Sequence, residues 1–515
     1  MASETQIGRA PVSLDELLAL ARGERKAVLW DDPAYRARLA AGFDAVERRV
    51  ARDLPVYGVT TGVGSAVVES VPPEHQGEIA RNLIGSLGVG TGRILDELEA
   101  AAVVTARAIS LAPGHSGVRA RVIERLCELL NARVLPRIPA EGSVGASGDL
   151  APLSYLAALV AGEREATLRG RECSAAEAHA ALGFAPLELS AKEALALVNG
   201  TSVMTALGAL AVERAERLAR LACALTAIAS EVTHGNAGHF DARIHAWKPH
   251  PGQVRAAAWI AADLDFDPSR PLPAPARLQD PYSIRCAPHA LGVLLDAAAL
   301  ARGVLEVELN GANDNPLVDP DTGDVLHGGN FYGGHVCFAL DALKSAVAGC
   351  ADLLDRQLAV LCQPRASDGL PANLIAVEGA QRPAHSGFKA MQIAASALTA
   401  EAQKHSMPAS AFTRSTESHN QDKVSLATIA ARDALRVLEL AETVAAIVLL
   451  AGCQALELRG VERARGRRRA LLEAVRKEVP GLGDDRRQDR DIARVLALLR
   501  GGVLPLEGGL PLGGG

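Results

Sequence analysis

The amino-acid sequence predicts a mainly α-helical protein, in which a loop-rich N-terminal region is followed by a long central helical bundle. Hydrophobic residues make up 49% of the 515 residues, whereas aromatic residues make up only 3%. The core must therefore consist of Ala, Leu and Val, which suit closely packed helices. Glycine and proline clusters divide the first part of the chain, to about residue 280, into short segments. Beyond about residue 285 the sequence changes to long, periodic segments rich in Ala and Leu.

Four long helices are expected in this second part. Between residues 340 and 361, apolar residues recur at alternating intervals of three and four, which is the period of one helix face. The segment 432–459 has few polar residues toward its end, so we expect neighbouring helices to bury it. Two further helices are expected at 289–310 and 386–404, and antiparallel bundling is their natural packing. The sequence therefore predicts an N-terminal domain over residues 1–215, a helical bundle domain over 216–505 and a flexible tail over 506–515.

Composition argues against several classes of function. The formal net charge of −6 provides no basic surface for nucleic acid. No segment is long and apolar enough to span a bilayer, and the N-terminus lacks a secretion signal. The eight cysteines have no short, ligand-like spacing, which is typical of a reduced, cytoplasmic protein. Four histidines at positions 234, 239, 245 and 250 match neither a helix face nor a zinc-binding pattern, so no metal is expected.

The stretch GSVGASGDLAPLS, residues 142–154, is a glycine-rich turn that leads into an apolar, helix-like segment. A nucleophile elbow would need glycine where Asp149 stands, and a phosphate loop would need a Gly-Lys-Ser/Thr ending. The simplest interpretation is a tight turn, with Asp149 capping the helix that follows. A second interpretation uses Gly148, whose amide nitrogen can bend back onto the carbonyl carbon of Ala146 because no side chain obstructs it. Loss of water, including the Ser147 hydroxyl, would leave an electrophilic alkene on the resulting ring.

This turn resembles the signature of the aromatic amino acid ammonia-lyase and aminomutase family. Seven further segments match that family in order and span most of the chain: YGVTTGVGS (57–65), NLIGSLGVGTG (82–92), AKEALALVNGTSVMT (191–205), QDPYSIRC (279–286), ELNGANDNPLVD (308–319), HGGNFYGG (327–334) and SHNQDKVSLATIAAR (418–432).

The resemblance implies an ammonia-lyase-like fold and a self-formed prosthetic group. In that family the tripeptide equivalent to Ala146, Ser147 and Gly148 condenses to 4-methylideneimidazole-5-one (MIO), so no diffusible cofactor is expected. The resemblance also implies a homotetramer in which more than one subunit contributes to each active site. A small aromatic amino acid is then the only other partner expected.

The resemblance further assigns roles to individual residues. Tyr57 is expected to act as the base that removes the β-proton of the substrate, and Tyr282 to lie near the prosthetic ring. Arg285 is expected to hold the substrate carboxylate, because a planar guanidinium binds a carboxylate with two hydrogen bonds. Asn315 is expected to add another hydrogen bond there. The remaining expected substrate- or ring-binding residues are Asn199, Gln279 and Phe331, together with Asn420 and Gln421 of the Asn-Gln-Asp element that ends at Asp422.

The substrate is predicted from Gln421 and the pair Ser86-Leu87. Histidine-specific members of the family usually carry a carboxylate at position 421, and at the pair they carry Ser-His. Tyrosine lyases tend to have His-Leu there and phenylalanine lyases Phe-Leu, so this chain matches none of them. Beside Leu87, an unpaired imidazole N–H would cost on the order of 1–3 kcal/mol. The sequence therefore predicts elimination of ammonia from L-tyrosine or L-phenylalanine, giving 4-coumarate or cinnamate.

Three alternatives remain open. An aromatic amino acid 2,3-aminomutase would return the ammonia to the β-carbon, and the sequence hardly separates it from a lyase. A histidine ammonia-lyase would form urocanate, which Leu87 and Gln421 disfavour. A non-catalytic helical scaffold is disfavoured by the presence of Tyr57, Arg285 and the 146–148 triplet together. His289, four residues after Arg285, is interpreted as a packing residue near the carboxylate site.

Overall fold

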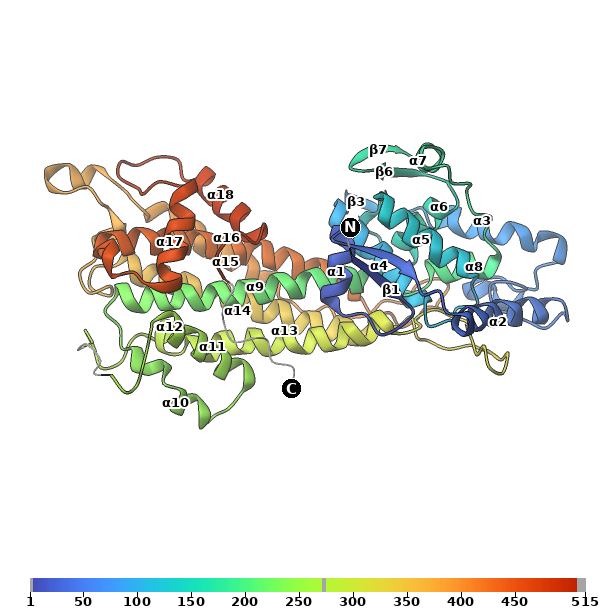
Figure 1. The fold of residues 1–515 in the computed structure, drawn as a ribbon, viewed down its shortest axis with the longest axis horizontal. Helices are drawn as coiled ribbons and strands as arrows, with labels where there is room; N and C mark the ends of the chain where they lie inside the picture. The colour runs from blue at the N-terminus through green and yellow to red at the C-terminus, as the bar shows by residue number, and fades with distance from the viewer. Residues whose placement is uncertain (1–2, 271–274, 507–515) are drawn as a thin grey trace. The chain divides into compact units, whose positions relative to one another are not determined.

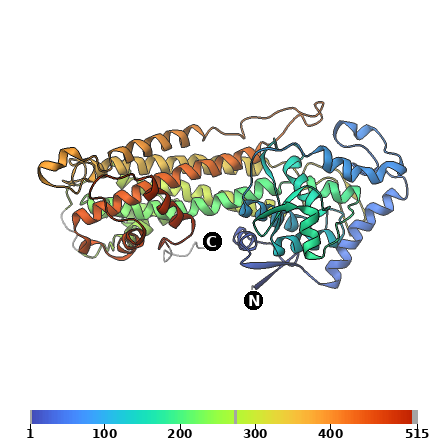
Figure 2. The same cartoon turned by 90° about the horizontal axis from the view of Figure 1, so that it is seen from above.

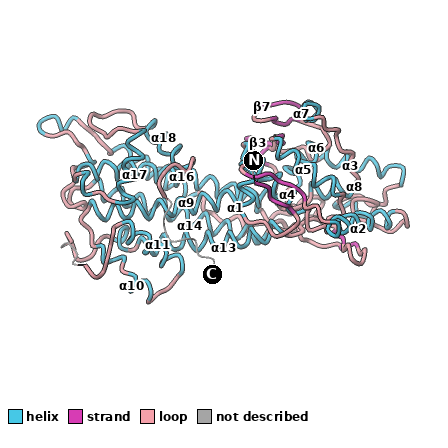
Figure 3. The backbone as a smooth tube through the Cα atoms, viewed as in Figure 1, coloured by secondary structure: helices cyan, strands magenta, loops and turns pink. Residues whose placement is uncertain are grey.

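The computed structural model describes residues 3–270 and 275–506 of the chain, and most of them are helical (Figure 1). In Figure 3 the helices are cyan and the short strands magenta. The mainly α-helical architecture predicted from the sequence is confirmed. Among the described residues, no helix combines the length and apolar character needed to cross a membrane.

The chain divides into two compact units by its contacts. The first unit comprises residues 1–210, 301–341 and 408–432, and the second comprises residues 211–300, 342–407 and 433–515. Four of the boundaries fall inside long helices, namely α9 (Ser202–Val232), α13 (Ala287–Asn310), α14 (Gly334–Cys362) and α16 (Ala427–Arg459). The units are therefore interleaved along the sequence, unlike the continuous domains 1–215 and 216–505 expected from it. The expected tail lies outside the described residues except for Leu506.

The first unit contains every described strand and most of the shorter helices. Its helices outside the four long ones are α1 (Leu14–Arg22), α2 (Pro33–Val50), α3 (Gln76–Ser86), α4 (Glu97–Leu111), α5 (Ala120–Ala132), α6 (Leu150–Val160), α7 (Ala175–Leu182) and α8 (Ala191–Val198). Its strands are β1 (Ser3–Ile7), β2 (Arg25–Leu29), β3 (Thr91–Ile94), β4 (Val134–Pro136), β5 (Pro139–Glu141), β6 (Glu165–Leu168), β7 (Arg171–Ser174), β8 (Leu317–Val318) and β9 (Val325–Leu326).

The strands form small separate sheets. β1 pairs in parallel with β2, placing Ser3 opposite Arg25 and Ile7 opposite Leu29. β3 pairs antiparallel with β5, β8 antiparallel with β9, and β4, β6 and β7 form a three-stranded antiparallel sheet. None is large enough to supply a core of its own, so the helices of the first unit supply it.

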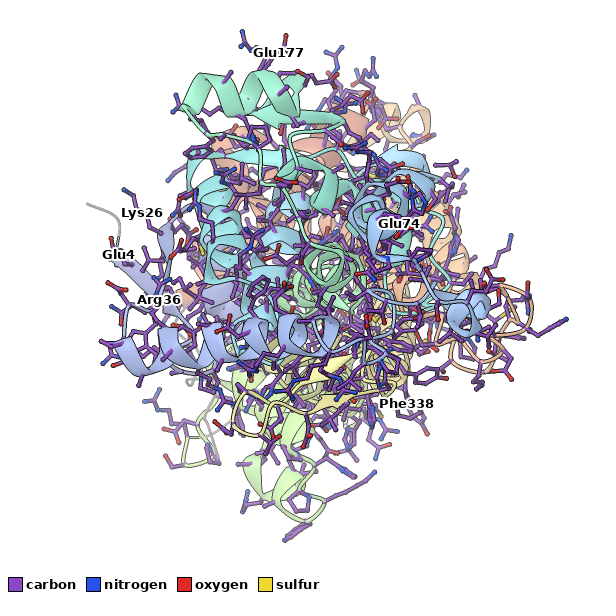
Figure 4. All side chains as sticks on the ribbon, turned by 90° about the vertical axis from the view of Figure 1, so that its right-hand side faces the viewer. Glu4, Lys26, Arg36, Glu74, Glu177 and Phe338 are labelled. Atoms are coloured by element: carbon purple, nitrogen blue, oxygen red, sulfur yellow. The ribbon has the colours of Figure 1, made fainter. Side chains whose placement is uncertain are left out.

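Local signals in the sequence explain where several helices begin. In a capping box, the N-cap side chain accepts a hydrogen bond from the amide of the third helical residue, and the side chain of that residue accepts one from the N-cap amide. The first unit contains four capping boxes, which start α1, α4, α7 and α8: Ser13 with Glu16, Asp96 with Glu99, Ser174 with Glu177 (labelled in Figure 4) and Ser190 with Glu193.

α4 and α8 form the centre of the first unit. All residues of α8 are buried, and α4 is buried from Glu99 to Leu111. Because α8 is enclosed on all sides, its C-terminal end is fixed, and this end carries Asn199.

The second unit consists of helices and loops. The long helices lie side by side there, joined by α15 (Lys389–Lys404) (Figure 2). Buried polar contacts connect them: Arg220 of α9 pairs with Asp263 of α11 (Pro251–Asp263), and Gln357 of α14 donates to Thr226 of α9 at 2.8 Å. The remaining helices are α10 (Ala242–Ala246), α12 (Tyr282–Arg285), α17 (Gly466–Glu478) and α18 (Asp489–Arg500). The four helices expected from the sequence are present as α13, α14, α15 and α16.

Candidate active site

A cavity of about 620 Å³ lies within the first unit. Its walls come from the loop that follows α2, the C-terminal end of α3, the 145–150 turn, the end of α8 and the loops near residues 315, 331 and 420. The short helix that carries Glu74, labelled in Figure 4, leads into α3. Ten of the residues expected from the sequence line this cavity: Tyr57, Ser86, Leu87, Ala146, Ser147, Asn199, Asn315, Phe331, Asn420 and Gln421.

The glycine-rich turn crosses the wall of this cavity. Ser147 and Gly148 both adopt the left-handed backbone region, with φ of 50° and 76°. A Cβ atom at residue 148 would overlap the carbonyl oxygen of Gly200, so only glycine fits there. The amide of Asp149 donates to the same carbonyl oxygen at 2.7 Å. A tight turn whose last residue must be glycine fits a group formed from the backbone of Ala146, Ser147 and Gly148.

Asp149 corrects the simplest interpretation of the turn. α6 begins after Asp149 as expected, but the Asp149 side chain makes no capping hydrogen bond to that helix. Its carboxylate instead accepts from the amides of Val203 and Met204 at 2.9 Å each, and from the hydroxyl of Thr428. It therefore caps α9, which starts at Ser202. Complete burial raises the pKa of Asp149 to about 6.

Asn199 connects the turn to a neighbouring loop. Its side-chain amide donates to the carbonyl oxygen of Ser147 at 2.7 Å, and its side-chain oxygen accepts from the backbone amide of Asn315 at 2.6 Å. Behind it, the fully buried Arg107 donates to the backbone oxygen of Asn199 at 2.7 Å. Burial lowers the pKa of Arg107 to about 10. Arg107 was not expected from the sequence, because a charged residue within an apolar helix gives no local sign of its partners.

Tyr57 lies in the loop on another wall. Its phenol oxygen accepts a hydrogen bond from the amide of Gly64 at 2.7 Å. Burial raises the pKa of Tyr57, the Gly64 amide opposes this by stabilising the phenolate, and the Glu417 carboxylate raises the pKa further. In the chain by itself, Tyr57 is therefore protonated at neutral pH.

Glu417 is a cavity residue that sequence reasoning missed. Its carboxylate accepts from the amide of Ser65 at 2.9 Å and from the Ser65 hydroxyl at 2.8 Å, so it holds the residue next to Gly64. The backbone of residues 417–419 has φ between 51° and 63°, an uncommon conformation for three successive non-glycine residues. The same loop brings Gln421 to the turn, where its amide donates to the Ser147 hydroxyl at 3.1 Å.

Four expected site residues do not line the cavity: Gly148, which lies in the turn directly after Ser147, and three residues farther along the chain. Gln279, Tyr282 and Arg285 belong to the second unit, whereas all residues that line the cavity belong to the first. The Arg285 guanidinium lies 4.4 Å from the centre of the Tyr282 ring and donates to the backbone oxygen of Asp280 at 3.0 Å. Tyr282 is 71% exposed. His289 lies in the same unit, with its ring centre 5.5 Å from that of His245.

Comparison with known proteins identifies the family. Residues 12–477 match the family model described as aromatic amino acid lyase. The chain belongs to this family. It is therefore a carbon–nitrogen lyase, and dependence on MIO is general among its members. The family inferred from the sequence motifs is confirmed.

Individual relatives cover nearly the whole chain. The chain is 40% identical over 509 residues to a histidine ammonia-lyase of Koribacter versatilis, which covers 96% of this chain and 97% of that protein. Among solved structures, tyrosine aminomutase from Streptomyces globisporus has a TM-score of 0.90 at 34% identity, with 98% of each chain covered. Histidine ammonia-lyase from Trypanosoma cruzi has a TM-score of 0.88 at 34% identity, covering 98% of this chain and 94% of that one.

These relatives overturn the predicted substrate. Eight curated relatives at 37–40% identity and nearly full coverage are all histidine ammonia-lyases. The prediction of L-tyrosine or L-phenylalanine was therefore wrong. It rested on Gln421 and the pair Ser86-Leu87, although Glu417 and Asp422, whose carboxylates can accept a hydrogen bond from an imidazole N–H, also line the cavity.

Proposed function

We propose that this protein is a histidine ammonia-lyase that converts L-histidine to urocanate and ammonia without oxidation. The observation that carries the proposal is the agreement of eight curated relatives, at 37–40% identity, on this activity. The cavity supports it, because the glycine-rich turn, Tyr57 and Asn199 all line one space. A volume of about 620 Å³ is ample for one amino acid.

The polar groups around Gln421 are suited to imidazole recognition. An imidazole ring has a donor and an acceptor nitrogen, and it needs partners for both when it leaves water. Glu417 and Asp422 provide acceptors, whereas the Gln421 amide can donate as well as accept. Leu87 then packs against the apolar edge of the ring. Other histidine-specific members usually carry a carboxylate at position 421. In this proposal Glu417 and Asp422 take over the role of that carboxylate.

The proposed prosthetic group is MIO, formed from Ala146, Ser147 and Gly148. When formed, it supplies an electrophilic alkene that makes the substrate amine a better leaving group. The amide of Asn199 contacts the Ser147 carbonyl oxygen, which the ring would retain, so Asn199 would hold and polarise the ring. The amide of Gln421 contacts the Ser147 hydroxyl, which condensation would remove, so Gln421 would be released to bind the substrate. Phe331 lines the same cavity and would exclude water from it.

Tyr57 is the proposed base for the β-proton of the substrate. The Gly64 amide, 2.7 Å from the phenol oxygen, favours the phenolate. Burial and Glu417 oppose it, so a cationic group must come close before Tyr57 can act at moderate pH. Arg285 is the cation that the family resemblance assigns to the substrate carboxylate.

Arg285, Tyr282 and Gln279 are proposed to enter the cavity from another copy of this chain. All three belong to the second unit and none lines the cavity, which supports an active site shared within a homotetramer. Two side chains, Tyr282 and Gln279, are exposed and therefore available for such a contact. The cytoplasmic location inferred from composition remains a part of this proposal.

The test is turnover of L-histidine by the purified protein. We expect urocanate and ammonia to form in equal amounts, identified by chromatography and mass. The Ser147→Ala variant is the matched control, and it should lose turnover while its helical circular dichroism is kept. Formation of a β-amino acid in place of urocanate would show that the protein is an aminomutase. Absence of any product from L-histidine would refute the proposal.

A further inference from the structure

The C-terminal end of α3 carries part of the cavity wall. Leu83, Ser86 and Leu87 all line the cavity, and they lie on the last turn of the helix and just beyond it. The last four carbonyl groups of a helix have no partners within the helix. Internal bonds at this end reach the carbonyl oxygens of Leu83, Gly85 and Leu87, and those from the amides of Leu87 and Gly88 are long, at 3.3 Å each. A group outside the helix must therefore fix its position.

Arg164, in the turn between α6 and β6, is such a group. One guanidinium nitrogen donates to the carbonyl oxygen of Ile84, and the other donates to the Ser154 hydroxyl at 3.0 Å. The Ser154 hydroxyl lies 2.7 Å from the carbonyl oxygen of Ala151 in its own helix and 3.1 Å from that of Leu87. A positive charge at this place also interacts favourably with the C-terminal end of the helix dipole. Arg164 thus caps the end of α3 directly at Ile84, and it holds the Ser154 hydroxyl near Leu87.

The same contacts connect α3 to the glycine-rich turn. Ser154 lies on α6, which begins immediately after the 146–148 triplet. The guanidinium of Arg164 also lies 4.6 Å from the centre of the Tyr155 ring, on the same helix. Because α6 is almost entirely buried, it is a firm base for these contacts. Arg164 therefore links the Ser86-Leu87 wall to the element that follows the reacting triplet.

Two backbone features accompany these contacts. Arg164 has φ of 66°, a region where glycine is the unstrained residue and other residues are disfavoured. A Cβ atom on residue 88 would lie 2.6 Å from an Arg164 nitrogen, so a side chain there would force the guanidinium to move from its present contacts.

We propose that Arg164 is a positioning residue that fixes the Ser86-Leu87 wall relative to the 146–148 turn and thereby sets the discrimination among aromatic side chains. The inference rests on the proposed function in one respect, namely that the ring of the substrate lies against this wall. Arg164 acts through the end of α3 and does not touch the substrate. Its loss should change the relative affinity for different rings more than it changes the fold.

The chain offers a matched control in Arg169. Arg169 also has a positive φ, 51°, and lies in the turn between β6 and β7, at the other end of the strand that follows Arg164. Unlike Arg164, its side chain is exposed. Replacing either arginine with glycine relieves the backbone in the same way, so the two variants differ in the side-chain contacts that they lose. Glycine is favoured at both positions, which protects folding. Arg164→Lys keeps the positive charge but removes the planar guanidinium, whose two nitrogens contact Ser154 and Ile84.

Two readouts test the proposal. The first is the ratio of the Kd values for L-histidine and L-phenylalanine, measured by calorimetry in a Tyr57→Phe background so that no turnover occurs. We expect Arg164→Gly to change this ratio by at least about fivefold and Arg169→Gly by less than about twofold, with Arg164→Lys between them. The second is amide hydrogen exchange, which should become faster at residues 84–88 in Arg164→Gly only.

Each outcome supports or overturns one part of the proposal. Unchanged exchange at residues 84–88 would overturn the proposed hold on α3. Faster exchange with an unchanged Kd ratio would overturn the role in discrimination. If the wild-type protein makes no urocanate, the proposed function fails, but both readouts still decide the inference, because neither needs turnover.

Discussion

At the scale of single residues, Tyr57 is where opposing physical effects meet. Burial and the Glu417 carboxylate raise the pKa of Tyr57, whereas the Gly64 amide lowers it. Glu417 has a second effect through its hydrogen bonds to Ser65, which hold the loop that presents the Gly64 amide. The charge of Glu417 and its hydrogen bonds therefore act in opposite directions on the proposed base.

Glu417→Gln separates these two effects. The amide oxygen of Gln can still accept from Ser65, but the negative charge is gone, so the pKa of Tyr57 should fall. A base acts when deprotonated, and the rising limb of kcat/KM against pH should therefore move to lower pH. Glu417→Ala should instead lower kcat, because the loop loses its contact. A limb that stays in place, or that moves to higher pH in Glu417→Gln, would contradict this account of Tyr57.

The residues of the cavity also show what the sequence could and could not predict. The motifs identified ten of the residues that line it, because family segments far apart in the chain meet there. Glu417 was missed although it directly precedes a matched segment, SHNQDKVSLATIAAR. Its importance depends on an unusual backbone conformation and on Ser65, more than 300 residues earlier, and no local pattern encodes such a contact. The predicted substrate rested on Gln421 and the pair Ser86-Leu87 and did not take Glu417 into account.

At the scale of elements, α8 holds Asn199 in place through a buried ion pair. Lys192 of α8 donates to Asp314 at 2.8 Å, and both side chains are 1% exposed. Ser116 donates to the other carboxylate oxygen of Asp314 at 2.8 Å. Asp314 directly precedes Asn315, whose amide donates to Asn199. The pair therefore fixes α8 relative to the loop that carries Asn315, and both contribute to the cavity.

Lys192→Met should leave the Asp314 carboxylate buried without a charge partner. We expect it to destabilise the fold by about 3–5 kcal/mol, which thermal unfolding would show as a lowered Tm. The double variant Lys192→Met/Asp314→Leu removes both charges and should be more stable than Lys192→Met alone. A double variant that is no more stable than the single one would contradict the role of the pair.

Secondary structure was more predictable than its tertiary contacts. Periodicity located α13, α14, α15 and α16, because each presents a continuous apolar face. The same reasoning placed the start of α6 correctly but assigned Asp149 to the wrong helix. Its carboxylate caps α9, whose first residues lie more than 50 positions later. Such a cap depends on how the helices pack, and the helix propensity of the local sequence does not describe that packing.

At the scale of the whole molecule, the proposed active site draws on both units. The cavity belongs to the first unit, and Arg285 and Tyr282 belong to the second. If another copy of the chain supplies them, two differently inactivated variants should complement each other. The interleaved units themselves were not predictable from composition, because the boundaries lie within continuous helices.

Tyr57→Phe and Arg285→Ala should each be inactive alone and partly active when co-expressed. With random mixing, a site that takes each residue from a different subunit is intact in about a quarter of cases, so about a quarter of wild-type activity is expected. The control is a mixture of the two variants purified separately as oligomers. Without exchange of subunits this mixture should remain inactive. Co-expressed variants that remain inactive would contradict shared sites.

The central claim is that the backbone of Ala146, Ser147 and Gly148 condenses into the electrophile on which ammonia elimination depends. The intact mass of the active wild-type protein tests it most directly. We expect a mass lower by two water molecules than the encoded sequence, and the encoded mass for Ser147→Ala. A preparation that releases ammonia from L-histidine at full rate while keeping the mass of the unmodified chain would contradict the claim.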